Sequence, residues 1–144
     1  MEQKNYHNSI QVNASAADAY AQIANVAGWW AKSFKGKASK TGDTFNVQFG
    51  DTRVDFEITE AIPGKKVVWK VTDCYLPWLN DKTEWNNTEV AWNIGTANGK
   101  TTIDMTHVGL QPGVECYEAC KKGWDGHISD SLFRLVTEGV GKPQ

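Results

Sequence analysis

The chain has 144 residues, a formal net charge of -2 and a sequence pI of about 5.9, and this length predicts one domain over residues 1–144. It contains no basic run or stripe, so the footprint for a phosphate backbone is missing and nucleic acid is not expected as a partner. No apolar run approaches the ~18 residues of a membrane span, and the polar N-terminus has no signal-peptide core, so no membrane association is expected.

The cysteines bear on the cellular location of the protein, and the tryptophans bear on how its core is filled. Cys74, Cys116 and Cys120 are an odd number without disulfide density, which fits a reducing cytosol and predicts a cytoplasmic location. Each tryptophan can bury on the order of 150–250 Å² of surface, so a small core fills with such rings only with difficulty. Either the rings interdigitate in a solid core, or they line a cavity that another molecule fills. The seven are Trp29, Trp30, Trp69, Trp78, Trp85, Trp92 and Trp124.

The N-terminal part predicts one strand and two short helices. Alternation over residues 6–12 is typical of a strand. Ser15 is a suitable N-cap for the alanine-rich residues 16–24, which carry Asp18 in the first turn. Residues 25–30 predict a second helical turn that ends in two adjacent tryptophans.

Turn signals at strand spacing occupy the middle of the chain. Asn98-Gly99 favours a type I′ hairpin turn, which needs positive φ at both central residues, and Pro63-Gly64 suits a type II turn. Successive hairpins predict an antiparallel meander and not a βαβ fold. The predicted strands are 44–49, 52–62, 65–75, 88–97 and 100–110, with 34–40 as a weaker sixth.

Alternation within these strands predicts one buried face, on the concave side of the sheet. Asp55, Glu57 and Glu89 fall on the opposite face near Arg53 and indicate solvated surface charge. The connection 76–87 is long for a hairpin and carries two tryptophans, so it is either a lid or aromatic packing on the sheet rim. The buried face is assigned to Val54, Phe56, Ile58, Val67, Trp69, Val71, Val90, Trp92, Ile94, Ile103, Met105 and His107.

A C-terminal amphipathic helix is predicted from about Val114 to Glu138. Gly123 and Gly126 flank Trp124 within it, although each glycine costs roughly 1 kcal/mol relative to alanine. We expect them to let the helix approach the sheet closely, with Gly123 packed; the alternative is a locally weak, kinked helix. The apolar stripe comprises Tyr117, Cys120, Trp124, Ile128, Ser131, Leu132 and Leu135.

The order strand, two short helices, six-strand meander and long C-terminal helix resembles the START-like (SRPBCC) superfamily. Within it the chain is most similar to the branch named after the activator of the heat-shock protein 90 ATPase. The resemblance implies an α+β helix-grip fold, β-α-α-β(6)-α, with an antiparallel sheet wrapped around the C-terminal helix. It rests on Ile10–Ser15 entering Ala19-Tyr20, Gly28-Trp29-Trp30, Val67-Val68-Trp69, Thr106–Leu110, and Gly123-Trp124 with Leu132 and Leu135.

The resemblance also carries functional expectations. Members of the superfamily commonly hold a hydrophobic small molecule between sheet and helix, and some carry out catalysis there. The eukaryotic activators have a separate N-terminal domain that takes a large part in engaging the chaperone, so this chain resembles only their C-terminal module.

We therefore expect a non-catalytic protein that binds a small hydrophobic or aromatic molecule, without a cofactor. The alternative is an interaction module for a heat-shock protein 90-type chaperone. A weaker alternative is an enzyme that uses His107 as a base, against a histidine merely satisfied by a neighbouring hydroxyl or carbonyl. The candidate ligand-binding residues are Trp30, Phe56, Trp69, Trp92, Met105, His107, Trp124 and Ile128.

A metal site is not expected. Cys116, Cys120 and His127 fall near one face of the predicted helix. At a rise of ~1.5 Å per residue, however, Cys120 and His127 lie roughly 10 Å apart along the axis, too far for one zinc ion.

Overall fold

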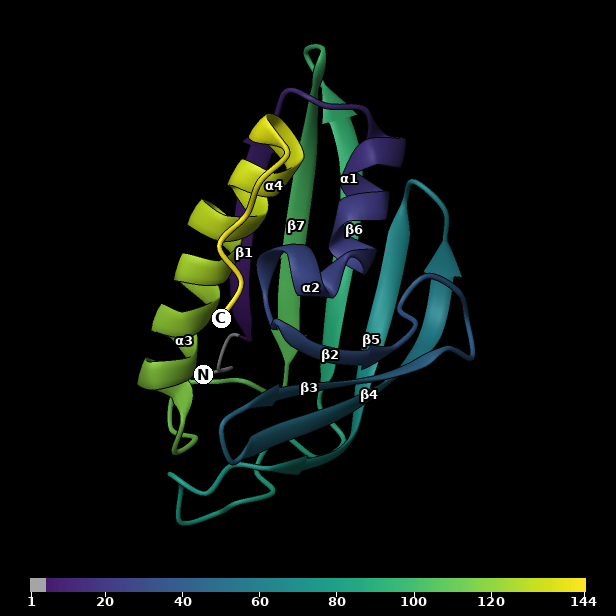
Figure 1. The fold of residues 1–144 in the computed structure, drawn as a ribbon. Helices are drawn as coiled ribbons and strands as arrows, with labels where there is room; N and C mark the ends of the chain where they lie inside the picture. The colour runs from purple at the N-terminus through teal and green to yellow at the C-terminus, as the bar shows by residue number, and fades with distance from the viewer. Residues whose placement is uncertain (1–4) are drawn as a thin grey trace.

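The computed structural model describes residues 5–144; Met1–Lys4, part of the predicted single domain, lie outside the described residues. One antiparallel sheet of seven strands, in the order β1-β7-β6-β5-β4-β3-β2, forms the body of the fold (Figure 1). The elements are β1 (Tyr6–Val12), α1 (Ala16–Ala24), α2 (Val26–Trp29), β2 (Ser33–Gly36), β3 (Thr44–Phe49), β4 (Thr52–Ile62), β5 (Lys66–Tyr75), β6 (Glu89–Ala97), β7 (Lys100–Val108), α3 (Tyr117–Gly126), η1 (His127–Leu132) and α4 (Phe133–Glu138).

The predicted α+β helix-grip fold is confirmed, and several bounds agree to the residue because local chemistry sets them. The Ser15 hydroxyl accepts the Asp18 N–H at 3.0 Å, which starts α1 where the capping pattern predicts. Asn98 and Gly99 have φ values of 54° and 76°, as the type I′ turn between β6 and β7 requires. The predicted strand 34–40 is shorter, because β2 ends at Gly36.

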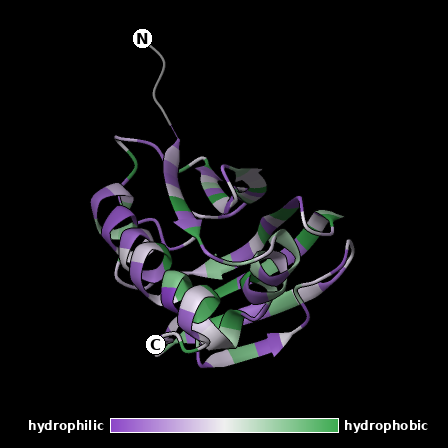
Figure 2. Ribbon diagram, turned by 90° about the horizontal axis from the view of Figure 1, so that it is seen from above, coloured by the Kyte–Doolittle hydropathy of each residue, from purple (hydrophilic) through white to green (hydrophobic). Residues whose placement is uncertain are grey.

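The sheet curls so that its concave face holds the helices. The β4–β5 pairing contains two register shifts, between Asp55 and Phe56 and between Ile58 and Glu60; bulges of this kind bend a strand and increase its twist. Seen from above, the apolar segments of sheet and helices meet in the interior (Figure 2). All twelve residues assigned to the concave face are buried.

The C-terminal helix differs from the prediction in two ways. It starts at Tyr117, three residues later than expected, and a π-helical turn separates α3 from α4. Stripe residues four apart drift by about 40° per step in an α-helix of 3.6 residues per turn. A π turn has more residues per turn, so it rotates the later stripe residues back toward the sheet. Trp124, Ile128 and Leu132 are accordingly all buried.

The expected role of the helix glycines is wrong. A Cβ placed on Gly123 or on Gly126 would have nothing within 4 Å, so neither glycine lets the helix approach the sheet. The close approach lies at Gly28 of α2, where a Cβ would stand 2.6 Å from Asn25 Nδ2 and 3.0 Å from Leu135 Cδ2. The alternative of a locally irregular helix agrees with the π turn that follows Gly126.

The cysteine expectation is also wrong in part. Cys116 and Cys120 are joined by a disulfide, and Cys74 is free and buried. The cysteine pattern therefore no longer indicates a particular compartment.

Within residues 5–144, none of the helices combines the length and the apolar character that crossing a bilayer requires.

These glycine environments give a stability prediction. Gly123→Ala and Gly126→Ala should each be neutral or stabilise the protein by up to ~1 kcal/mol, because alanine favours helix and meets open space. Gly28→Ala should destabilise it by about 1–3 kcal/mol, because the methyl group overpacks against Leu135. Urea unfolding of the three variants measures these differences. A clearly destabilised Gly123→Ala would contradict the open space beside α3.

Candidate ligand pocket between the sheet and helix α3

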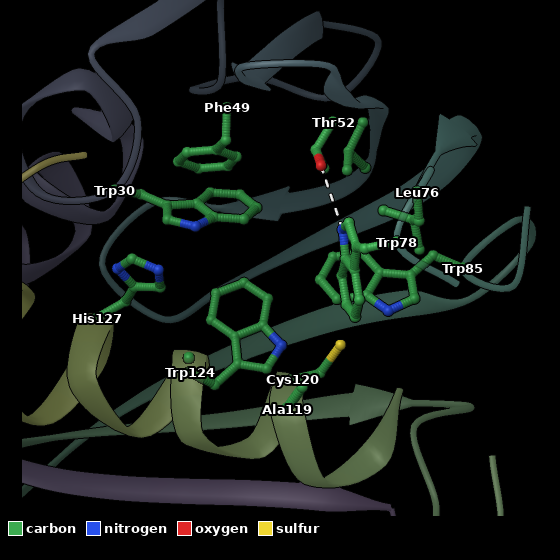
Figure 3. Close-up of a pocket in the computed structure, with 12 residues that line it drawn as sticks. Trp30, Phe49, Thr52, Leu76, Trp78, Trp85, Ala119, Cys120, Trp124 and His127 are labelled. Carbon is green, nitrogen blue, oxygen red and sulfur yellow. Dashed lines mark hydrogen bonds between the residues drawn. The ribbon is translucent and has the colours of Figure 1, made fainter. Parts of the chain in front are cut away.

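A pocket of about 150 Å³ lies between the sheet and α3 (Figure 3). The sheet contributes Phe49, Thr52 and Val54, and the connection 76–87 contributes Leu76, Trp78 and Trp85. Its remaining walls are Trp30, which follows α2, and Ala119, Cys120, Gly123, Trp124 and His127 from the C-terminal helix.

Aromatic rings form most of the wall. The Trp85 and Trp124 rings stack with centroids 6.0 Å apart and planes 9° apart. The centroid of the Trp30 ring lies 4.9 Å from that of Trp124. The Trp30 ring also stacks on Trp69, with centroids 6.1 Å apart and an angle of 9° between the ring planes. Each of these rings is therefore packed against at least one other ring of the wall or the core.

A chain of buried hydrogen bonds fixes two of these rings. Trp124 Nε1–H donates to His107 Nδ1 at 3.1 Å. The proton of a neutral imidazole therefore lies on Nε2, which donates to Thr88 Oγ1 at 2.9 Å. The Thr88 hydroxyl in turn donates to the Trp85 carbonyl at 2.7 Å. Helix α3, strand β7 and the loop before β6 are thus joined by one polar chain.

His107 is a satisfied core histidine. It is fully buried, both ring nitrogens are engaged, and it lies behind the pocket wall. Burial lowers its pKa from 6.5 to about 3, so it stays neutral at physiological pH. A ligand in the pocket would not reach it.

The eight predicted ligand-binding residues divide into two groups. Trp30 and Trp124 line the pocket. The other six are buried in the layer behind it: Phe56, Trp69, Trp92, Met105, His107 and Ile128. The tryptophan-rich interior is therefore a solid core with a cavity at one end.

Sequence reasoning missed most of the wall. The two tryptophans of the connection 76–87 were one signal, and the structure places them differently. Trp85 is buried within the wall, whereas Trp78 is 51% exposed at the rim and donates from Nε1 to Thr52 Oγ1 at 3.2 Å. Val54 and Cys120 were assigned to apolar faces, but the sequence pattern does not show that these positions border a cavity. Cys120, Gly123 and His127 recur at intervals of three and four residues on α3 and the start of η1, so they share the helix face that borders the cavity.

The connection 76–87 is tied to the start of α3. The Glu115 carboxylate accepts the backbone N–H groups of Asn80 at 2.8 Å and Asp81 at 3.0 Å, and these bonds lower the pKa of Glu115. Leu76 and Leu79 are buried beneath it. These hydrogen bonds and buried leucines therefore fix the connection 76–87 in place as one wall of the pocket.

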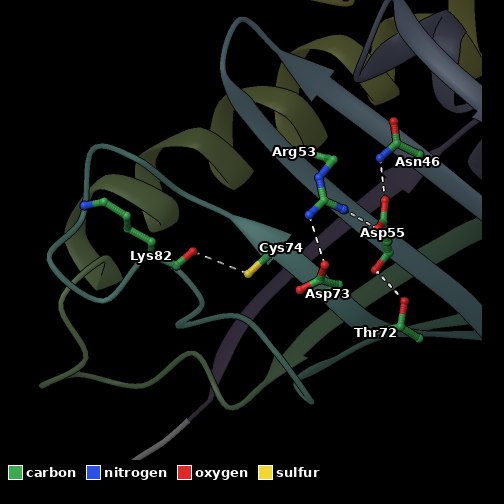
Figure 4. Close-up of polar contacts among 7 residues, drawn as sticks. All are labelled: Asn46, Arg53, Asp55, Thr72, Asp73, Cys74 and Lys82. Atoms are coloured by element: carbon green, nitrogen blue, oxygen red, sulfur yellow. Dashed lines mark hydrogen bonds and ion pairs between the residues drawn. The ribbon is translucent and has the colours of Figure 1, made fainter.

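The outer face of the sheet carries the charges. Arg53 pairs with Asp55 and, at 2.9 Å, with Asp73, and this guanidinium holds the pKa of Asp73 below its usual range (Figure 4). These groups are partly solvated ion pairs away from the pocket. Within residues 5–144, no three His, Cys, Asp or Glu side chains are grouped so as to hold a metal ion.

The fold and the position of the pocket define a START-like helix-grip protein. The family described as Activator of Hsp90 ATPase homolog 1-like protein matches residues 18–137, and the chain belongs to this family. Among curated proteins, no sequence matches it.

Solved structures agree on the fold. The Aha1 dimer from Colwellia psychrerythraea is 24% identical, with a TM-score of 0.78 over 95% of this chain and 98% of that chain. DynU16, from the dynemicin biosynthetic locus, is 18% identical with a TM-score of 0.75, over 97% of this chain and 49% of that one. CalU16 from Micromonospora echinospora is 10% identical with a TM-score of 0.65, over 94% and 86%. At these identities the likeness establishes the fold alone.

The buried imidazole predicts a pH dependence. The unfolded chain protonates His107 below about pH 6.5, whereas the folded chain does so only near pH 3, so stability falls as the pH falls through this window. His107→Gln keeps one donor and one acceptor but cannot titrate. Between pH 7.5 and 5.5 the parent should lose about 1.4 kcal/mol more of its unfolding free energy than this variant. Urea unfolding at the two pH values tests this; equal losses would contradict the buried neutral histidine.

Proposed function

We propose that the protein binds one small apolar or aromatic molecule non-covalently in the pocket beside α3. The observation that supports this best is an apolar cavity of about 150 Å³ whose wall contains four tryptophans. An engineered cavity of about this volume in another protein takes up benzene or xenon. Trp78 is half exposed at the rim, so a ligand can enter there without disturbing the core.

Two polar side chains would orient the ligand. His127 lines the pocket, and burial lowers its pKa, so it is neutral near pH 7. Its ring is stacked against Phe49 at 6.4 Å. Among the described residues no side chain hydrogen-bonds to it. Thr52 accepts from Trp78 and keeps its own hydroxyl proton for donation. The proposed ligand is therefore a ring of one or two cycles with one hydroxyl or carbonyl group.

A binding role is favoured over catalysis by the chemistry of the wall. Among the pocket residues, His127 is the one side chain that could serve as an acid or a base. It has no carboxylate beside it on that wall to orient it or to share a proton. His107 is engaged on both nitrogens behind the indoles.

Gly123 and Gly126 offer a matched pair of variants for testing this. Both have open space at the Cβ position, but only Gly123 lines the pocket. Gly123→Leu should place a branched side chain in the cavity and weaken binding of toluene, indole and 1-naphthol by at least about tenfold, while Gly126→Leu should bind them as the parent does. Ligand-observed NMR and quenching of tryptophan emission measure the affinities.

The parent protein gives the decisive control. If none of the three probes binds saturably to it, the pocket is not a ligand site. Equal binding to both leucine variants would place any observed ligand elsewhere on the molecule.

A second candidate function is contact with a heat-shock protein 90-type chaperone. It is supported by membership of the activator-like family and by two exposed aromatic side chains, Trp78 at 51% on the rim of the pocket and Tyr75 at 43% beside Arg53 on the outer face of the sheet. Exposed aromatic residues are enriched in protein interfaces.

This candidate has its own measurement. The chain resembles one module of the larger activators, so we expect less than about a twofold rise in the ATPase rate of the host's own chaperone at stoichiometric protein. A several-fold rise that is lost in a Tyr75→Ala, Trp78→Ala double variant would make chaperone contact the main function.

A further inference from the structure

Two sulfur atoms lie where α3 begins, and the proposed function uses neither for chemistry. Cys116 is the residue before the first turn of α3, and Cys120 lies one turn further on. The two are joined by a disulfide with Cα atoms 5.6 Å apart. A disulfide in the wall of a ligand pocket adds a reactive bond to an otherwise apolar cavity.

The two sulfurs differ in access. Cys116 is fully buried, with 0% of its surface exposed, and its Sγ accepts the Trp85 indole N–H at 3.2 Å. Cys120 is 8% exposed and lines the pocket together with Trp85 and Trp124. Of the two cysteines, Cys120 is therefore the one that a nucleophile entering the pocket would meet.

The buried sulfur is the one suited to leave. The N–H groups of the first turn of a helix are not paired within it, so they stabilise negative charge that develops on a sulfur at the helix N-terminus. Cys116 has this position at the start of a ten-residue helix, and the Trp85 N–H would stabilise its thiolate further.

One neighbouring charge opposes this. The Glu84 carboxylate lies against the backbone N–H groups of Glu115 and Cys116 and competes for them. The Glu115 carboxylate is turned away, toward Asn80 and Asp81. The charge of Glu84 should therefore slow the release of Cys116 as a thiolate.

We infer that Cys116–Cys120 is a thiol-exchange site that captures small apolar thiols entering the pocket. The thiol loses its proton to water, and its sulfur forms a bond to Cys120 Sγ. The Cys116–Cys120 bond breaks, and its electron pair leaves with Cys116 Sγ, which then takes a proton from water. The products are a mixed disulfide on Cys120 and a thiol on Cys116. Attack by Cys116 on that mixed disulfide restores the bridge and releases the ligand.

The inference uses the pocket but does not need the non-covalent ligand of the proposed function. The space of about 150 Å³ and its aromatic wall favour a benzyl-sized thiol. They disfavour a charged, peptide-sized thiol, which cannot leave water at low cost in such a cavity. Selectivity between two thiols is therefore the property to measure.

The test compares benzyl mercaptan with glutathione, each corrected for its thiolate fraction and its rate with an unhindered disulfide. Protein purified without reductant is incubated with each thiol, quenched with acid, and examined by intact and peptide mass spectrometry. We expect the adduct on Cys120 and a rate at least about tenfold higher for benzyl mercaptan. Gly123→Leu should slow this reaction by about tenfold or more and Gly126→Leu should not, while Glu84→Gln should speed it several-fold.

Three results would overturn the inference: free thiols at both positions in the purified protein, an adduct on Cys116, or equal corrected rates for the two thiols. The first two readouts need no variant, so a misfolded Gly123→Leu cannot obscure them. If the adduct forms on Cys120 while toluene, indole and 1-naphthol fail to bind, the proposed function fails and the exchange site stands. If those probes bind but no adduct forms, the proposed function stands and the exchange site fails.

Discussion

The hydrogen bond from the Trp124 indole to His107 is the contact on which the rest of the site depends. It joins the C-terminal helix to strand β7, and both side chains are buried. A buried N–H left without an acceptor costs about 1–3 kcal/mol, so this bond selects one rotation of α3 on the sheet. Through Thr88 the same imidazole also holds the carbonyl of Trp85. The two stacked indoles of the pocket wall therefore share one anchor.

The cavity follows from how large flat rings pack. Trp30 contacts the rings of Trp29, Trp69 and Trp124 at centroid distances of 4.9 to 6.1 Å, and all four rings are buried. The pocket is bordered on the helix by Gly123, which has no side chain to fill the space. The glycine beside Trp124 thus makes room for a cavity and not for closer contact with the sheet.

Much of the fold could be predicted from the sequence, because strands and caps are local features. The alternation of Val54, Phe56 and Ile58 and the Asn98-Gly99 turn each depend on a few neighbouring residues, and the structure has them where the pattern indicates. The π turn could not be predicted, since it corrects a mismatch between the stripe spacing and a sheet that is distant in sequence. The pocket could not be predicted either. Phe56, Trp69 and Trp92 lie on the same apolar sheet face as Val54, which lines the pocket. Which residues of that face border the cavity depends on where the connection 76–87 packs in the folded protein.

The central claim is that a buried neutral imidazole, protonated on Nε2, fixes the indoles of Trp124 and Trp85. Two-bond ¹H–¹⁵N correlation spectra of the His107 ring test it most directly, because they distinguish the two neutral tautomers and the charged form. The account predicts the Nε2–H tautomer, unchanged from about pH 8 down to about pH 4. An Nδ1–H tautomer, or titration of His107 near its ordinary pKa of about 6.5, would contradict it.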